Sequence, residues 1–231
     1  WRTSWRTCSA RRSRQRRLDL ARVCRVRLLT VLDIDRVLSP NAVESFDDDA
    51  GDDVRDAVFG GRVRFARLTE FFLALSAHNV LLALLSARAE PLLAHVLGAA
   101  GLGHFFGLRV FGRDAVRAHG GSRAAVLRAE LLEPLGKRAS DALVVDADAA
   151  SCAEVGALSC AVVHQPRAAG AGGGMGAAEF DAVQEWVHER LLGAQREAYE
   201  QAARAGLAAP SARAAGLPGV ELGARRLGAS S

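Results

Sequence analysis

Cysteine, methionine, tyrosine and long apolar runs are all scarce in this sequence of 231 residues. Its four cysteines, Cys8, Cys24, Cys152 and Cys160, form no C-x-x-C pair and show no zinc-ligand spacing, and a domain of this size needs no disulfides for stability. No apolar run approaches the roughly 20 residues that a helix needs to cross a bilayer. These absences exclude a disulfide-stapled or membrane-spanning design. We expect a soluble protein with no membrane partner, cytoplasmic by default.

Positive charge is concentrated at the N-terminus. The formal net charge is +4, and residues 1–27 contain ten arginines against one acidic residue, Asp19. Such an acid-poor leader is typical of an organellar transit peptide or of a nucleic-acid-binding arm, and a misframed gene model would also produce it. We expect a disordered leader and an organellar location only if the leader is a transit peptide. Because few aromatic residues alternate with these arginines, nucleic acid is a disfavoured partner.

Apolar runs alternate with amphipathic segments along the rest of the chain, and half of all residues are hydrophobic. We expect strands at 28–32, 80–85, 108–111, 142–145 and 160–164. We expect helices at 62–78, 90–98, 122–135, 152–158 and 177–203. This order predicts an α/β fold, a doubly wound parallel sheet in three α/β/α layers, within a domain at 28–203. A polar, acidic excursion at 39–56, a Gly-rich loop at 168–176 and a disordered Ala/Gly-rich tail at 204–231 complete the prediction.

The first predicted strand ends in two carboxylates, Asp33 and Asp35. Residues 28–32 read as an apolar strand covered on both faces, and open α/β sheets bind ligands at the carboxyl ends of their strands. Two like charges repel unless a cation lies between them. Mg²⁺ would relieve that repulsion and leave one carboxylate free to attack a phosphoryl group. The alternative is a polar turn that follows a strand.

Taken together, several strand ends resemble the motifs of the haloacid dehalogenase-like (HAD) superfamily of phosphohydrolases, over residues 28–191. The first motif, D-x-D-x-V-L, begins at Asp33. By this resemblance Asp33 is the nucleophile that forms an aspartyl-phosphate, and Asp35 is the general acid/base. The second motif, an apolar strand ending in Ser or Thr, is matched by Ser86, whose hydroxyl would bind a phosphate oxygen. A helix cap is the alternative role for this serine.

The third and fourth motifs depart from the family pattern. Arg123 stands where the family has a lysine, and it keeps the charge without the compact ammonium group. In one register of the fourth motif Asp146 is kept and Ala147 occupies the metal-ligand position. In the other register Asp146 is itself the ligand, and Asp148 reaches the ion if the loop bends. By resemblance, the Mg²⁺ ligands are Asp33, Asp35, Asp146 and Asp148.

The spacing from residue 86 to residue 123 leaves room for one helix and one strand, so no large cap domain is expected and the site should be open. Capless relatives act on proteins or other large substrates, which makes a phosphorylated protein a candidate substrate by analogy. The first hypothesis is a Mg²⁺-dependent phosphohydrolase that works through an aspartyl-phosphate. The second is a catalytically impaired HAD-like module that binds a phosphorylated partner, favoured by Arg123 and Ala147. The third is a nucleic-acid-associated protein that binds through its leader.

We expect the predicted site residues to converge in one cleft, with the strand before Asp33 at the centre of the sheet. The acidic segment 47–53 is expected to be mobile and to hold no metal, because so little apolar surface cannot offset the entropy lost on ordering.

Overall fold

The computed structural model describes residues 28–44, 53–165 and 173–204. The chain divides into two compact units, and residues 25–191 form the unit that contains the sheet. Some of the predicted segments lie outside the described residues, so the structure does not test them. They are the leader, the acidic residues 47–52, residues 168–172 and residues 205–231. The domain limits at 28 and 203 therefore stay a prediction.

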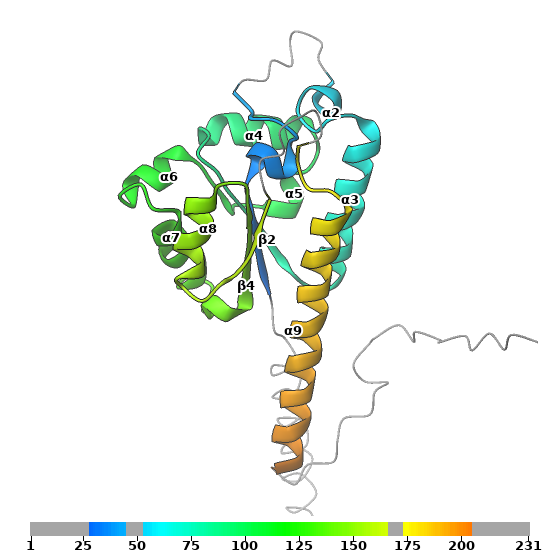
Figure 1. The fold of residues 1–231 in the computed structure, drawn as a ribbon, viewed down its shortest axis with the longest axis vertical. Helices are drawn as coiled ribbons and strands as arrows, with labels where there is room; N and C mark the ends of the chain where they lie inside the picture. Colours follow the sequence, from blue (N-terminus) through cyan, green and yellow to red (C-terminus); the bar gives the residue numbers. More distant parts are fainter. Residues whose placement is uncertain (1–27, 45–52, 166–172, 205–231) are drawn as a thin grey trace, which may run out of the picture. The chain divides into compact units, whose positions relative to one another are not determined.

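Strands and helices alternate along the described residues, as the apolar pattern predicts (Figure 1). The strands are β1 (Leu29–Leu32), β2 (Leu81–Leu85), β3 (Val110–Phe111), β4 (Ala142–Asp146) and β5 (Ala161–His164). The α-helices are α2 (Val54–Ala57), α3 (Arg62–Ala77), α4 (Glu90–Ala99), α5 (Gly103–Phe106), α6 (Arg113–Ala118), α7 (Arg123–Val126), α8 (Ala149–Gly156) and α9 (Ala177–Arg204). Shorter helical turns are η1 (Ile34–Leu38), η2 (Leu127–Leu132) and η3 (Ala139–Asp141).

Within the described residues, five parallel strands form one sheet in the order β3-β2-β1-β4-β5. Val31 of the central strand pairs with Ala83 on one side and with Val144 on the other. The chain runs outward from β1 to β3 and then returns to the other side of β1 to add β4 and β5. The connections change direction between β1 and β4, and this switch point is where doubly wound sheets open a crevice for ligands.

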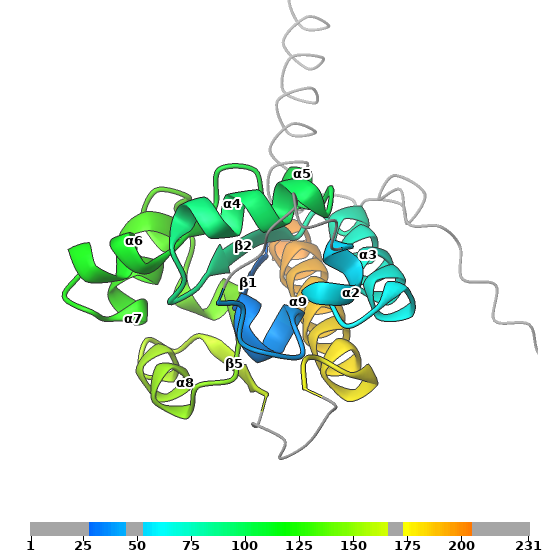
Figure 2. The ribbon, with the colours of Figure 1, turned by 90° about the horizontal axis from the view of Figure 1, so that it is seen from above.

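Helices cover both faces of the sheet, which confirms the predicted three layers (Figure 2). On one face, Leu28 and Leu32 pack in a cluster with residues of α3, α4, α5 and α9. On the other face, Leu29 and Val31 pack with residues of α7, η2 and α8. The alternation arises because successive side chains of a strand point to opposite faces. Both faces are covered, and the central strand is apolar except for the buried Thr30.

Several predicted boundaries were wrong by a few residues. The third strand is limited to Val110–Phe111, and Leu108 is 99% exposed. The predicted helix at 122–135 is divided between α7 and η2, and α5 and α6 are short helices that the periodicity did not predict. Helix α8 begins at Ala149, three residues before its predicted start, because the side chain of Asp148 caps it by accepting a hydrogen bond from Ser151 N. Caps of this kind set helix ends independently of apolar spacing.

The prediction of an exposed excursion at 39–56 was wrong for the ends of that segment. Ser39, Val43 and Val54 are buried, and α2 packs onto the amino end of α3. The two valines join the larger apolar cluster, which outweighs the polar composition around them. Between Ser86 and Arg123 the described chain holds only α4, α5, β3 and α6, so no cap domain is inserted there. No helix of the described residues is long and apolar enough to cross a membrane.

Candidate active site

A cleft of about 530 Å³ opens at the carboxyl ends of β1 and β4, at the switch point of the sheet. The structure brings the predicted site residues together there, although they come from four separate segments of the chain. The cleft is lined by Asp33, Asp35, Arg123, Asp146 and Asp148. Ser86 lies fully buried at the end of β2, close enough to Asp33 for its hydroxyl to lower the pKa of that carboxyl.

Asp33 immediately follows the central strand, and its side chain is held by backbone and side-chain donors. Its Oδ1 accepts hydrogen bonds from the amide of Ile34 at 2.6 Å and from the amide of Asp35 at 3.3 Å. Its Oδ2 accepts a hydrogen bond from Arg123 Nη1 at 2.8 Å. The residue is only 4% exposed. The carboxylate is therefore fixed in one orientation at the base of the cleft.

Arg123 bridges the carboxylates of β1 and β4. The same Nη1 that contacts Asp33 also contacts Asp146 Oδ2 in a very short ion pair. The Arg123 side chain is 15% exposed, against 5% for Asp33 and 3% for Asp146. The sequence predicts that a cation offsets the repulsion between neighbouring carboxylates. In the structure the guanidinium group of Arg123 lies between the carboxylates of Asp33 and Asp146.

The charges in this buried group alter one another's ionisation. Burial raises the pKa of Asp33, the Arg123 cation lowers it, and the negative charge of Asp146 raises it again, so that the net pKa lies above its ordinary value. Burial lowers the pKa of Arg123, but the attraction of Asp33 and Asp146 outweighs burial and raises it. Arg123 therefore stays charged, and burial favours the protonated form of Asp33.

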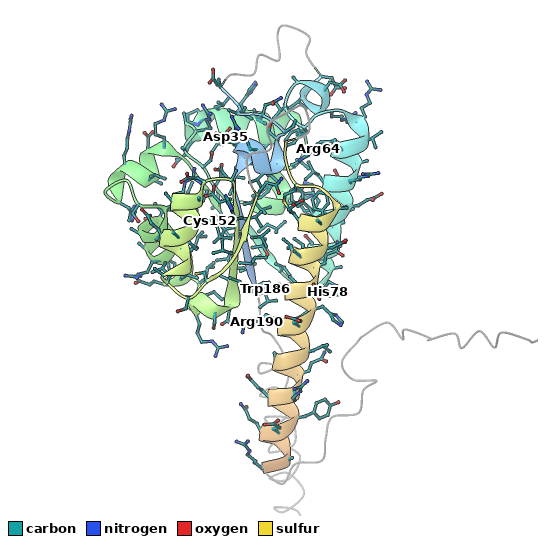
Figure 3. The ribbon with its side chains drawn as sticks, in the orientation of Figure 1. Asp35, Arg64, His78, Cys152, Trp186 and Arg190 are labelled. Atoms are coloured by element: carbon teal, nitrogen blue, oxygen red, sulfur yellow. The ribbon has the colours of Figure 1, made fainter. Side chains whose placement is uncertain are left out.

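Asp35 lies above the carboxyl end of the sheet in the η1 turn (Figure 3) and has an arginine partner that the sequence did not predict. Its Oδ2 accepts a hydrogen bond from Arg88 Nε at 2.6 Å, and its Oδ1 accepts one from the amide of Val43 at 2.7 Å. Arg88 also lines the cleft. The one feature of the sequence that could have indicated Arg88 is its position two residues after Ser86, just beyond the end of β2. The Ser86 hydroxyl accepts a hydrogen bond from the Arg88 amide at 3.3 Å, so this serine has the capping role as well as its contact with Asp33.

The end of β4 places Asp146 inside the cleft and uses Asp148 as a helix cap. Asp146 Oδ1 accepts from the amide of Asp148 at 2.9 Å, and its Oδ2 accepts from Ser151 Oγ at 2.7 Å. Ala147 between them lines the cleft and is almost completely buried. Among the described residues, no three Asp, Glu, His or Cys side chains are grouped so as to hold a metal ion by themselves.

A larger hollow of about 1050 Å³ lies between α3 and the first turns of α9. None of the residues that the sequence predicts for the site lies in its wall. The smaller cleft holds all the paired charges described above, so the chemistry favours it over the larger hollow.

No protein-family model and no curated protein sequence matches this chain. Among solved structures, the chain is similar to a haloacid dehalogenase-like hydrolase from Streptococcus pneumoniae, at 11% identity and a TM-score of 0.44, covering 69% of this chain and 91% of that one. It is also similar to a hypothetical protein from Xanthomonas campestris, at 20% identity and a TM-score of 0.45, covering 80% and 92%.

A further similar structure is 3-deoxy-D-manno-octulosonate 8-phosphate phosphatase from Moraxella catarrhalis, in complex with magnesium, phosphate and KDO. That similarity has 14% identity and a TM-score of 0.42, and it covers 80% of this chain and 97% of that one. Neither the identities nor the TM-scores of these neighbours are high enough to assign this chain to their families. At TM-scores below 0.5 they add nothing about substrate or mechanism, which have to come from the residues of the cleft.

Proposed function

We propose that this protein is a phosphohydrolase that transfers the phosphoryl group of a phosphomonoester to Asp33 and then to water. The observation that supports this most is the fixed Asp33 carboxylate at the switch point, with Arg123 beside it to neutralise developing charge. A nucleophile held in one orientation has less entropy to lose on reaching the transition state. A guanidinium group next to the phosphoryl group stabilises the negative charge that gathers there.

The reaction has two steps. An Asp33 oxygen attacks phosphorus, the bond from phosphorus to the alcohol oxygen breaks, and that oxygen takes a proton from Asp35. Water then attacks phosphorus and gives a proton to Asp35, the bond from phosphorus to Asp33 breaks, and inorganic phosphate leaves. Arg88 orients the Asp35 carboxyl for both proton transfers. Because only ionised Asp33 is a nucleophile, and its pKa is raised by burial, the rate should increase with pH through that pKa.

The donor set fits Mg²⁺ through two carboxylates. Mg²⁺ is usually held by one or two carboxylates, with water and substrate phosphate completing its octahedron. Asp33 and Asp146 are the proposed ligands, because both already share a cation at the switch point. Asp35 belongs to a separate ion pair with Arg88, and Asp148 caps α8, so neither shares this position; Mg²⁺ bound there would displace Arg123 Nη1 from Asp33 and Asp146. Bound there, the ion would polarise the phosphoryl oxygens and neutralise their charge.

A second candidate is a catalytically impaired module that binds a phosphorylated partner. The observation that favours it is the apolar Ala147 in the wall of the cleft, where one register of the fourth motif places a ligand. In that case the phosphoryl group binds beside Arg123 and is not transferred. The variant Ala147→Asp separates the two candidates, because it returns a carboxylate to that position.

The test measures hydrolysis of p-nitrophenyl phosphate by the full chain with Mg²⁺ and after removal of metal with EDTA. We expect slow, Mg²⁺-dependent turnover that Asp33→Asn abolishes, because an amide is not an anionic nucleophile. The matched control is Asp141→Asn, which makes the same change at the opposite end of β4 and breaks only the ion pair with Arg138. This control should keep the activity.

Turnover that survives in Asp33→Asn would overturn the proposed mechanism. A wild type without turnover, together with Mg²⁺-dependent turnover in Ala147→Asp, would establish the impaired module. If both proteins lack turnover and neither binds inorganic phosphate by calorimetry, both candidates are wrong.

A further inference from the structure

Arg36 occupies a backbone conformation that favours glycine. Its φ is 59° and its ψ is 7°, in the left-handed region, and it lies in the η1 turn between the Asp35 carboxylate and Val37. Long side chains rarely adopt this conformation, and residues held in it are concentrated at functional sites. Glycine at this position would remove the strain. The presence of arginine therefore needs an explanation from its side chain.

The η1 turn is held by contacts from outside it. Arg64, which lies on α3 (Figure 3), donates from its two terminal nitrogens to the carbonyls of Val37 at 3.0 Å and Leu38 at 3.1 Å. The amide of Met175 also donates to the Val37 carbonyl, at 2.8 Å. Strained residues persist where surrounding contacts determine the backbone in this way. The side chain at position 36 is thus free to serve another purpose.

Arg36 lines the cleft, is exposed, and forms no ion pair with any carboxylate of the described residues. The other two arginines of the cleft wall differ in this respect. Arg88 is paired with Asp35, and Arg123 is paired with the carboxylates at the ends of β1 and β4. Arg36 is therefore the one cation of the described cleft wall whose charge no neighbouring carboxylate neutralises.

The part of the cleft wall at α8 carries negative charge. Asp148 and Glu154 lie there at α8, and both line the cleft. An anionic group of a substrate is repelled from the α8 wall and attracted to the η1 wall, where Arg36 lies. A guanidinium group binds carboxylate or phosphate through two parallel hydrogen bonds, which makes it suited to fixing such a group.

We propose that Arg36 binds a second anionic group of the substrate, so that the preferred substrates are phosphomonoesters that also carry a carboxylate or a second phosphate. This inference rests on the proposed function, because it assumes that the reacting phosphoryl group lies beside Asp33. The second anionic group then lies at the η1 rim and selects among phosphomonoesters.

The test compares the wild type with Arg36→Ala, Arg36→Gly and Arg36→Lys on three probes: ethyl phosphate, phosphoglycolate and ethylene glycol bisphosphate. The quantity measured is the ratio of kcat/KM for each doubly anionic probe to that for ethyl phosphate. We expect this ratio to fall about tenfold in Arg36→Ala and Arg36→Gly, as the loss of one charged contact predicts, and less in Arg36→Lys. Arg67→Ala, which removes an exposed arginine from α3, is the matched control and should leave the ratio unchanged.

Thermal melting separates a binding role from a structural one. Arg36→Gly should melt above Arg36→Ala, because glycine accepts the left-handed backbone that alanine does not. A glycine variant that melts below the alanine variant would show that the strained turn is absent, and it would overturn the inference. A ratio that is the same in wild type and both small variants would also overturn it. If only one doubly anionic probe shows the effect, that probe identifies the group as carboxylate or phosphate.

Failure of the proposed function can be told apart from failure of this inference. If the wild type hydrolyses none of the probes, calorimetry measures their binding instead. A preference for the doubly anionic probes that is lost in Arg36→Ala would support the Arg36 site while the hydrolytic mechanism fails. Equal binding of all three probes by the wild type would overturn the Arg36 site.

Discussion

Replacing Arg123 with alanine removes the cation that lies between two buried carboxylates. Asp33 and Asp146 would then face each other across the switch point with no positive charge between them. Arg123 and both its partners are well under a third exposed, so solvent screens these pairs far less than it screens surface pairs. The energetic result should therefore be that of a broken buried ion pair.

Removing one partner of a buried pair costs about 3–5 kcal/mol, because it leaves a buried charge uncompensated. For a small domain the free energy of unfolding falls by about 2 kcal/mol per molar urea, so a loss of this size lowers the urea midpoint by about 1.5–2.5 M. Adding Asp146→Asn to Arg123→Ala removes one of the two like charges. The double variant should regain about 1–2 kcal/mol, within the range of coupling energies between contacting residues.

The loss should depend on pH, and its sign follows from Asp33. A carboxyl group whose pKa is higher in the folded state than in the unfolded state favours folding most at low pH, and this contribution is lost as pH rises from the unfolded pKa through the folded one. Arg123 lowers the pKa of Asp33, so its removal moves the folded pKa further up. The variant therefore relieves the uncompensated charge by protonating Asp33 as pH falls, and it should be closer to the wild type at pH 5 than at pH 8.

Urea unfolding followed by circular dichroism at pH 5, 7 and 8 measures these differences. Arg128→Ala, an exposed arginine of the following η2 turn, is the matched control and should cost less than about 0.5 kcal/mol. A loss below about 1 kcal/mol at pH 7 for Arg123→Ala would refute the buried-pair reasoning, which expects several times that amount. A large loss that is the same at all three pH values would refute the assignment of the raised pKa to Asp33.

Two further predictions concern glycine and cysteine. Gly174→Ala should destabilise the fold by about 1–3 kcal/mol, because Gly174 has a φ of +90° and a Cβ there would collide with the Arg64 guanidinium. Gly98→Ala, in α4 with open space around it, should instead stabilise by about 0.5–1 kcal/mol, and thermal melts showing equal shifts would contradict this. Burial, with Asp146 and Asp148 nearby, raises the pKa of Cys152 to about 11, so iodoacetamide at pH 8 should label it much more slowly in the native protein than in urea. Equal labelling rates by peptide mass spectrometry would show that the thiol is accessible.

The central strands could be predicted because burial on both faces requires apolar residues, and the sequence of these strands is apolar. A strand covered on both faces is apolar at nearly every position, and 28–32, 80–85 and 142–145 are such runs, with Thr30 as their one polar residue. The carboxylates that follow the first and third of these runs then share one edge of the sheet by topology alone. Boundaries set by single hydrogen bonds, such as the Asp148 cap of α8, were less predictable from apolar spacing.

Arg123 was expected near Asp33 only from the resemblance to the HAD motifs, and the Arg88 partner of Asp35 could not be predicted, because such pairs depend on how helices pack on the sheet. Asp35 and Arg88 are separated by 53 positions in sequence, and Arg123 and Asp33 by 90. The residues by themselves therefore predict a need for positive charge near Asp33, and only the resemblance names Arg123 for it. Burial of Val43 within an acidic segment was missed for the same reason, since its apolar neighbours are distant in sequence.

The sequence by itself determined the order of strands and helices, the α/β class and the presence of carboxylates at strand ends. These features follow from the local periodicity of apolar residues and from the residues that come directly after each apolar run. Only the tertiary structure decided which guanidinium neutralises which carboxylate, and that Arg36 is held in a left-handed turn with its charge unpaired among the described residues of the cleft. The physical reason is that ion pairing and burial depend on distances in space between segments far apart in the chain. Apolar periodicity predicts which segments are strands and helices, but it does not predict the distance between two charged side chains on different segments.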